Sequence, residues 1–303
     1  MTEIAEFNPV AGVMDWVEGG VRRVLAPNPS PMTFRGTNTY LVGRGEVAVI
    51  DPGPLSAPHM AAILRALEPG ERISHILVTH SHLDHSPLAR PLSAATGAPV
   101  LGFGGSDAGR SPAMDALAAG GDIGGGEGVD QDFRPDVVLA DGTRVSGRDW
   151  SLTAVHTPGH FGNHLSFVFD DVIFSGDHVM GWASSLISPP DGDMCAYMAS
   201  LDRLSTLPAR RFYPAHGAPV TEPAKRLAEL AAHRRAREAD ILRALEAGPA
   251  AIPALTRRIY TDVHPALFPA AERNVFAHLL DLTQRNRVSP VGPIGFSTVF
   301  RVT

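Results

Sequence analysis

The sequence predicts an α/β fold in which sheets and helices form layers, followed by a smaller helical module. Short β-rich runs alternate with helical patches over the first two thirds of the 303 residues, a pattern typical of layered α/β domains. The composition is 44% hydrophobic and 19% charged, which is ordinary for a globular chain. The length allows one large domain with an appendage.

The first half of the chain supplies two predicted strands and two predicted helices. A β-rich run at 46–50 ends in the turn Asp51-Pro52-Gly53. Apolar spacing predicts a helix at 57–67, and β-branched residues predict a buried strand at 73–78. A second helix is predicted at 86–96, with a proline near its start, where proline is tolerated.

The middle of the chain contains a glycine-rich stretch followed by three strands. Residues 102–128 show little periodicity, and we interpret them as a mobile surface loop of the kind that often forms a lid. Strands are then predicted at 151–156, 165–169 and 172–175, the last two joined in a tight hairpin.

The last part of the chain is predominantly helical. Helices are predicted at 194–207, 222–247, 252–260 and 269–287, and the Val, Pro, Gly and Phe content of 288–303 suggests a small hairpin. Helices followed by a hairpin indicate a winged-helix-like module. The basic run at 234–237 is interleaved with acidic residues, so we expect a solvated helix face there.

Charge divides the chain into two predicted domains, 1–220 and 221–303. Residues 222–303 carry 12 Lys and Arg against 8 Asp and Glu, which leaves 14 against 24 in residues 1–221. The acidic excess in residues 1–221 argues against general nucleic-acid binding, and we expect no stable binding to duplex DNA.

Composition also bears on the location of the protein. The single cysteine, Cys195, excludes an internal disulfide and a cysteine-rich zinc cluster. No apolar run approaches the ~18–20 residues needed to span a bilayer. The acidic residues near the N-terminus do not resemble the start of a signal peptide, so we expect a cytoplasmic protein without a membrane partner.

Four metal-binding side chains follow the predicted strand 73–78 within six residues. They are His80, His82, Asp84 and His85. Imidazole nitrogen and carboxylate oxygen are common zinc ligands, but one ion cannot easily use four groups from one tight turn. We therefore expect two metal ions, one served by His80 and His82 and the other by Asp84 and His85.

This cluster and four further segments resemble the metallo-β-lactamase superfamily. The segments read Val-His-Thr-Pro-Gly-His at 155–160, Phe-Ser-Gly-Asp-His at 174–178, Tyr-Pro-Ala-His-Gly at 213–217 and Ala-Val-Ile-Asp-Pro-Gly at 48–53. The resemblance covers roughly residues 20–220. It implies a four-layer αββα sandwich, and it implies that Asp51 supports the ligand loop.

The resemblance also implies a complete set of metal ligands. One ion would be held by His80, His82 and His160. The other would be held by Asp84, His85 and His216, and Asp177 would bridge the two. A carboxylate can bind two cations and balance their charge, which agrees with that role. We expect two divalent ions, zinc first, although manganese or iron suits the same ligands.

Further segments look like the lactamase-beta-like branch, which carries a winged-helix-like C-terminal module and includes an endoribonuclease. They lie at 175–182, 189–194, 197–204 and 276–279. Classical β-lactamases of this fold generally lack the bridging aspartate, so Asp177 argues against antibiotic hydrolysis as the main role. The branch implies single-stranded RNA as a substrate, whereas the acidic body fits a thioester or another small acyl compound.

Five other residues are weaker candidates for contact with the substrate. They are Asn38, Tyr40, His164, His178 and Trp182, although the bland interpretation of each is packing or support of a ligand.

These observations predict a dinuclear metal-dependent hydrolase. A water activated between the two ions would attack a thioester, another acyl group or a phosphodiester, and Asp84 and Asp177 would orient it. Two alternatives remain: an endoribonuclease, and a nucleic-acid-binding regulator without catalysis. The complete ligand set counts against the regulator.

Overall fold

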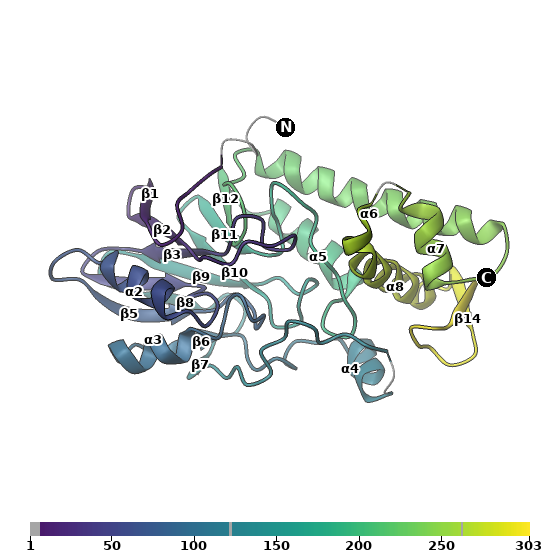
Figure 1. Ribbon diagram of the computed structural model, residues 1–303, viewed down its shortest axis with the longest axis horizontal. Helices are drawn as coiled ribbons and strands as arrows, with labels where there is room; N and C mark the ends of the chain where they lie inside the picture. Colours follow the sequence, from purple (N-terminus) through teal and green to yellow (C-terminus); the bar gives the residue numbers. More distant parts are fainter. Residues whose placement is uncertain (1–6, 121–122, 262) are drawn as a thin grey trace.

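The computed structural model describes residues 7–120, 123–261 and 263–303, and its larger part is built on two sheets (Figure 1). The first sheet contains, in spatial order, β1 (Met14–Glu18), β2 (Val21–Leu25), β3 (Asn38–Val42), β4 (Glu46–Ile50), β5 (Arg72–Leu77), β6 (Val100–Gly102) and β7 (Val137–Val138). Neighbours are antiparallel from β1 to β4 and parallel from β4 to β7.

The second sheet faces the first and carries the later strands of the chain. Its order is β12 (Arg211–Pro214), β11 (Val172–Gly176), β10 (Leu165–Phe169), β9 (Ser151–His156) and β8 (Arg144–Ser146). The predicted hairpin is confirmed, because β10 and β11 pair antiparallel across a turn in which Asp170 has a φ of 51°. Only β11 and β12 pair in parallel in this sheet.

Alternating side chains of β4 show how the layers are made. Val47 and Val49 pack into the core beneath the helices α2 (Ala57–Arg65) and α3 (Ala89–Thr96). Ala48 and Ile50 point to the opposite face and join the core between the two sheets. The helix α5 (Met194–Ser205) covers the outer face of the second sheet. The predicted αββα sandwich is therefore confirmed.

A second, helical part follows the sandwich along the chain. It contains α6 (Pro223–Glu246), α7 (Ile252–Ile259), a 3-10 helix (Pro265–Leu267) and α8 (Phe268–Gln284), with a small sheet of β13 (Ala250–Ala251), β15 (Val299–Val302) and β14 (Val288–Val291). Strands β14 and β15 form the expected hairpin. We call residues 223–303 the C-terminal module. Among the described helices, none is long and apolar enough to cross a membrane.

Two expectations differ from the structure. The glycine-rich stretch contains a helix, α4 (Pro112–Ala119), and its Met114, together with Ile123, lies in the core of the C-terminal module. The stretch therefore connects the two parts of the molecule. In the basic run of α6, Arg235 is exposed as expected. Arg234 is only 2% exposed, because its side chain packs against α5 and α8.

Candidate metal centre

The loop after β5 carries the first four candidate ligands, and Asp51 holds its shape. Asp51 follows β4 with a φ of 50°. Its Oδ1 accepts from the Thr79 backbone N–H at 2.7 Å, and its Oδ2 accepts from the Thr79 hydroxyl at 2.7 Å. The same Oδ2 lies 2.9 Å from His85 Nδ1. Asp51 therefore supports the ligand loop, as the resemblance implies.

The first group of candidate ligands consists of three histidines. His80 Nε2 lies 2.8 Å from His82 Nδ1, and His160 Nε2 lies 3.1 Å from the same atom. His80 and His82 come from the loop after β5, whereas His160 follows β9 of the other sheet. Three ring nitrogens therefore converge on one point across the two sheets.

The second group combines a carboxylate with two histidines. His216 Nε2 lies 3.1 Å from Asp84 Oδ2, and His85 Nε2 lies 3.4 Å from the same oxygen. His216 follows β12 and therefore also belongs to the second sheet. The ligand atoms of Asp84, His85 and His216 lie within 4.8 Å of one another.

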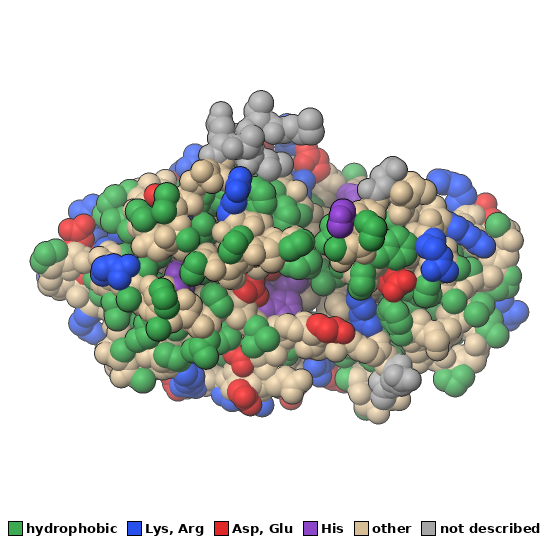
Figure 2. All heavy atoms as spheres, viewed as in Figure 1, with side chains coloured by type: hydrophobic (Ala, Val, Ile, Leu, Met, Phe, Trp, Pro, Cys, Tyr) green, Lys and Arg blue, Asp and Glu red, His purple; other side chains and the backbone are tan. Residues whose placement is uncertain are grey.

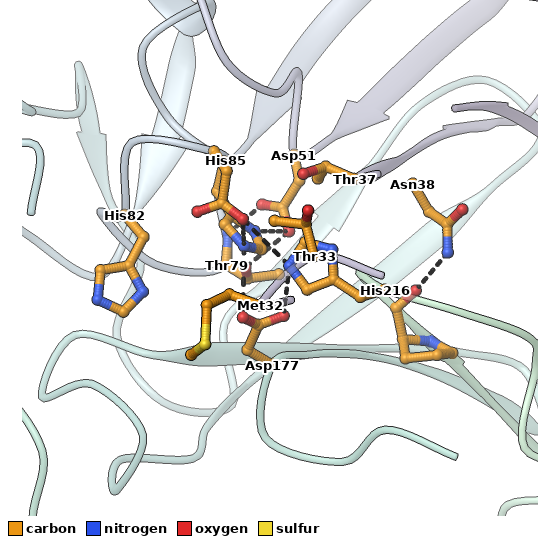
Figure 3. Close-up of polar contacts among 12 residues, drawn as sticks. Met32, Thr33, Thr37, Asn38, Asp51, Thr79, His82, His85, Asp177 and His216 are labelled. Carbon is orange, nitrogen blue, oxygen red and sulfur yellow. Dashed lines mark hydrogen bonds and ion pairs between the residues drawn. The ribbon is translucent and has the colours of Figure 1, made fainter. Parts of the chain in front are cut away.

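Asp177, at the end of β11, lies between the two groups. Its Oδ2 is 3.7 Å from His160 Nε2 and 3.6 Å from His85 Nε2, and its Oδ1 is 3.3 Å from His216 Nε2. Figure 3 shows Asp177, His85 and His216 facing one another. The structure thus brings all seven predicted ligands into one cluster, with Asp177 between the two groups.

The residues present fit metal cations. His85 Nε2 and Asp177 Oδ1 are buried, and within the described chain they have ion-pair contacts but no hydrogen bond. Buried polar atoms without a hydrogen bond are costly unless a ligand satisfies them. Nitrogen and oxygen donors in this number suit divalent ions such as zinc, manganese or iron.

The buried carboxylates of the cluster also favour positive charge beside them. Burial alone would lower the pKa of His216, but the carboxylates of Asp177 and Asp84 raise that pKa to about 10. Burial would likewise lower the pKa of His85, but the carboxylates of Asp84, Asp177 and Asp51 raise that pKa well above its usual value. Bound cations would balance the charge of these carboxylates while the histidines stay unprotonated.

Contacts on the far side of the rings orient two of the histidines. His160 Nδ1 donates to the Leu186 carbonyl at 2.6 Å, and His216 Nδ1 donates to the Gly36 carbonyl at 3.2 Å. When Nδ1 carries the proton, Nε2 is free to bind a metal. Both Nε2 atoms are the ones that face the cluster.

Asn38 and Tyr40 lie beneath the cleft rather than on its surface. The Asn38 amide donates to the carbonyls of Pro214 and Gly217 at 3.1 and 3.0 Å, and the Tyr40 hydroxyl donates to Pro214 at 2.8 Å. Asn38 is 0% exposed and Tyr40 is 2% exposed. The structure therefore corrects the expected substrate contact: both residues hold the loop that carries His216.

His164 and His178 are also fully buried, which corrects the same expectation for them. His164 Nε2 accepts from the Asp177 backbone N–H at 3.2 Å, and its Nδ1 lies 2.9 Å from the Thr157 hydroxyl. Burial lowers the pKa of His178 to about 3, and neither of its ring nitrogens has a hydrogen-bond partner in the described part of the chain.

Trp182 is half-buried and packs beside the His216 loop. Its ring stacks on Phe34 at a centroid distance of 5.0 Å. Gly217 lies so close that a Cβ there would be 2.6 Å from the Trp182 ring. Trp182 thus supports the loop after β12, and its remaining exposed edge is the part that a substrate could contact.

Two exposed apolar side chains near the ligands were not singled out from the sequence. Leu83 lies inside the ligand loop and is 51% exposed, and Met32 is 46% exposed. Figure 3 draws Met32 among the residues around the cluster, and Figure 2 shows histidine side chains in a hollow of the surface. No motif marks Met32 as part of the site, because only the fold brings it there.

Comparison with known proteins identifies the family. Residues 32–216 match the metallo-beta-lactamase superfamily, and residues 251–293 match the beta-lactamase associated winged helix domain. The chain belongs to the metallo-beta-lactamase superfamily, a family of hydrolases.

Several curated relatives show which proteins within this family are similar. Beta-lactamase-like protein 2 homolog of Drosophila melanogaster is 29% identical over 88% of this chain and 89% of its own length. Lactamase-like protein adaB of Aspergillus niger is 31% identical over 75% of this chain, and atrochrysone carboxyl ACP thioesterase dmxR1 of a Cryptosporiopsis species is 30% identical over 75%. The chain spans only 64% and 63% of the length of these two fungal relatives.

Solved structures agree with the fold. A beta-lactamase domain protein from Burkholderia ambifaria has a TM-score of 0.79 at 22% identity, over 99% of this chain and 96% of its own. A protein named TTHA1623, solved in a di-iron-bound form, has a TM-score of 0.50 at 28% identity, over 67% of this chain and 96% of its own.

Proposed function

We propose that this protein is a dinuclear metal-dependent hydrolase whose substrate is a thioester of a small acyl group. The observation that carries the proposal is the cluster of seven ligands with Asp177 between the two groups. His80, His82 and His160 would hold one divalent ion, and Asp84, His85 and His216 the other. We propose zinc as the native metal and the cytoplasm as the location.

The chain's own residues define most of the mechanism. Two bound divalent ions would supply Lewis acidity, which activates water and stabilises the developing negative charge. The Asp84 and Asp177 carboxylates face the centre of the cluster, where they can accept a hydrogen bond from the attacking water and orient it. The water oxygen adds to the thioester carbonyl carbon and the C–S bond breaks. The water's proton then passes to the leaving sulfur, which gives a carboxylic acid and a thiol.

Three observations favour a thioester over RNA. The fungal relative named as an ACP thioesterase is 30% identical. Met32 and Leu83 give the site exposed apolar surface, which suits an acyl chain better than a phosphodiester backbone. The sandwich part of the chain has a strong excess of acidic residues, which weakens attraction for a polyanion.

A cavity of about 350 Å³ offers room for the thiol part of the substrate. Val129 lines this cavity and forms a β-bridge with His82, so the cavity adjoins the ligand loop. Its wall is polar but balanced in charge, because the Arg110 guanidinium pairs with Asp191 at 2.6 Å. A neutral, amide-bearing thiol fits such a wall better than a chain of phosphates does.

The experiment that tests the proposal compares substrates and metals in one preparation. Protein stripped by chelator would be reconstituted with zinc, manganese or iron and assayed on acyl-CoA and acyl-glutathione thioesters, a fluorescent single-stranded oligoribonucleotide and a chromogenic cephalosporin. We expect metal-dependent thioester hydrolysis. Cleavage of the oligoribonucleotide with no thioester turnover would overturn the proposed substrate, and full thioester turnover by the stripped protein would overturn the mechanism.

A further inference from the structure

The segment between β11 and α5 has no regular secondary structure in residues 178–193, yet it contacts the metal cluster twice. The Leu186 carbonyl accepts the hydrogen bond from His160 Nδ1. The Ser185 hydroxyl donates to the Asp177 carbonyl at 2.5 Å. Backbone groups of an irregular segment need partners elsewhere, and those partners decide where the segment lies.

Side chains of the C-terminal module provide these partners on both sides of Leu186. Asn274 of α8 accepts at Oδ1 from the Ile187 backbone N–H at 3.1 Å. Arg234 of α6 donates to the Ser185 carbonyl. The two side chains also bond to each other, because the Arg234 guanidinium donates to Asn274 Oδ1 at 3.1 Å. The residues before and after Leu186 are thus held by one connected pair.

Burial and hydrogen bonds hold both side chains of this pair in place. Arg234 is 2% exposed, and its guanidinium lies 5.1 Å from the centre of the Tyr197 ring. A buried guanidinium is stable only where it is hydrogen-bonded, so the Arg234 side chain has little freedom to move. The Asn274 amide is fixed at its other end, since Nδ2 donates to the Ala270 carbonyl at 3.2 Å.

Two further arginines extend the same attachment along the segment. Arg226 of α6 donates to the carbonyls of Met180 and Ala183 at 2.7 and 2.8 Å. Arg273 of α8 donates to the Ser188 hydroxyl at 2.9 Å and to the Pro189 carbonyl. The C-terminal module therefore holds the segment at several points between Met180 and Pro189.

We infer that Asn274 and Arg234 are positioning residues for the metal ligand His160. They fix the Leu186 carbonyl, which fixes the Nδ1 proton and the ring plane of His160, and thereby point His160 Nε2 at the first ligand group. The C-terminal module is then part of the support of the metal centre. This inference rests on the proposed metal-dependent function.

The test measures metal binding as well as activity. Asn274→Ala removes the acceptor for Ile187 and Arg234. Loss of the direct partner of a metal-bound histidine typically costs about 10–100-fold in metal affinity, and Asn274 acts one contact behind that partner. We therefore expect zinc titration with a chromophoric chelator to show one site weakened by up to about 10-fold, with the other unchanged. The cobalt(II) absorption spectrum should change at the same site.

A matched control separates positioning from general stability. Arg285, just after α8, bonds to Glu238 and Asp281, away from the segment. Arg285→Ala should lower the melting temperature of the metal-free protein without changing either metal affinity. If Asn274→Ala fails to fold, Arg234→Lys provides the same test, because it keeps the charge but loses the forked contact to Ser185 and Asn274.

The outcomes distinguish this inference from the proposed function. Wild-type affinity at both sites in a folded Asn274→Ala or Arg234→Lys variant would overturn the inference, as would equal weakening in the Arg285→Ala control. A wild-type protein that binds no divalent metal would instead overturn the proposed function.

Discussion

The Asp177 carboxylate lies between the two ligand groups: its Oδ2 faces His160 and His85, and its Oδ1 faces His216. In the proposed dinuclear centre, Asp177 is therefore the residue on which the pairing of two cations depends most directly. His164 accepts a hydrogen bond from its backbone and Ser185 donates one to its carbonyl. The position of the carboxylate is thus set by its main chain as well as by β11.

The first prediction concerns this carboxylate. Asp177→Asn keeps the shape but removes the charge and one good ligand atom. We expect bound metal to fall from two ions toward one and kcat/KM on a thioester to fall by at least about a hundredfold. Metal analysis and steady-state kinetics check this. Asp202→Asn, at an exposed position of α5, is the control, and equal losses in both variants would contradict the prediction.

A second residue-scale feature is a buried ion pair far from the site. Arg22 of β2 donates to the Glu71 carboxylate at 2.6 and 3.2 Å and also to the carbonyls of Ala66 and Gly43. Arg22 is fully buried. Burial raises the pKa of Glu71, but the hydrogen bonds from Arg22 and from the Glu68 backbone N–H, together with the charge of Arg22, outweigh burial and lower that pKa below its usual value.

The second prediction follows from this pKa. A carboxyl with a lowered folded-state pKa stabilises the protein above its ordinary pKa of 4.5, and that stability is lost as the pH falls through the folded value. Glu71→Gln should reduce the free energy of unfolding by about 2 kcal/mol at pH 7. The variant should also lose part of the wild-type pH dependence below about pH 4.5. Denaturant titrations across pH measure both effects.

An exposed pair provides the comparison for that prediction. Glu222 contacts Lys225 at 3.0 Å, with side chains 67% and 63% exposed. Glu222→Gln should change the free energy of unfolding by no more than about 0.5 kcal/mol. If both substitutions cost the same, the special role of the Arg22 and Glu71 pair would be refuted.

At the scale of elements, the loop from β9 to His160 meets α5 at Gly159. The φ of Gly159 is +141°, and a Cβ there would lie 2.3 Å from Tyr197 Cα and 2.5 Å from Tyr197 N. These neighbours are backbone atoms of α5, which cannot move aside as a flexible side chain could. Glycine at this position therefore lets the loop approach α5 and carry His160 into the cluster.

The third prediction substitutes this glycine. Gly159→Ala should cost about 3 kcal/mol in the free energy of unfolding, from strain and overpacking together, and should weaken metal binding at the His160 side. Gly19→Ala is the control, since a Cβ at Gly19 meets nothing within 4 Å. Thermal unfolding and zinc titration would reveal the difference. A neutral Gly159→Ala would argue against this close approach.

Elements with strong local signals could be predicted from the sequence. The strand expected at 73–78 is β5 (Arg72–Leu77), and the helix expected at 57–67 is α2 (Ala57–Arg65), because β-branched runs and apolar spacing mark them. Short elements carry no such signal: β7 has two residues, and α4 has eight between glycine-rich segments. Their structure depends on tertiary partners.

The candidate site could be predicted to a similar extent. The ligands lie in short linear motifs, so their residue types and spacing reveal them. Leu186 and Asn274 could not be found in this way, because a backbone acceptor has no sequence signal and Asn274 lies 87 residues after the Ile187 that it contacts. The same reason explains why Arg234 resembled an ordinary surface residue.

At the scale of the whole molecule, the candidate metal centre lies where the loops that follow β5, β9, β11 and β12 of the two sheets meet. The fourth prediction is that divalent metal stabilises the folded chain by mass action. Metal at about a hundred times its dissociation constant adds about 2.7 kcal/mol to the free energy of unfolding. Chelation should therefore lower the melting temperature by several degrees.

A matched variant checks that this stabilisation comes from the site. In His216→Ala, the difference in melting temperature between metal-loaded and chelated protein should shrink, whereas the exposed His264→Ala should keep it. A difference that persists in full without His216 would place the stabilising metal elsewhere.

The division of ligands between two sheets also sets an order of events. His80, His82, Asp84 and His85 follow the first sheet, but each group of three converging ligands includes a residue from the second: His160, Asp177 or His216. A nascent chain with only its first sheet formed therefore lacks every complete site. In the proposed metal centre, capture by a complete site follows the joining of the two sheets, so the rate at which the new protein acquires metal reports that joining.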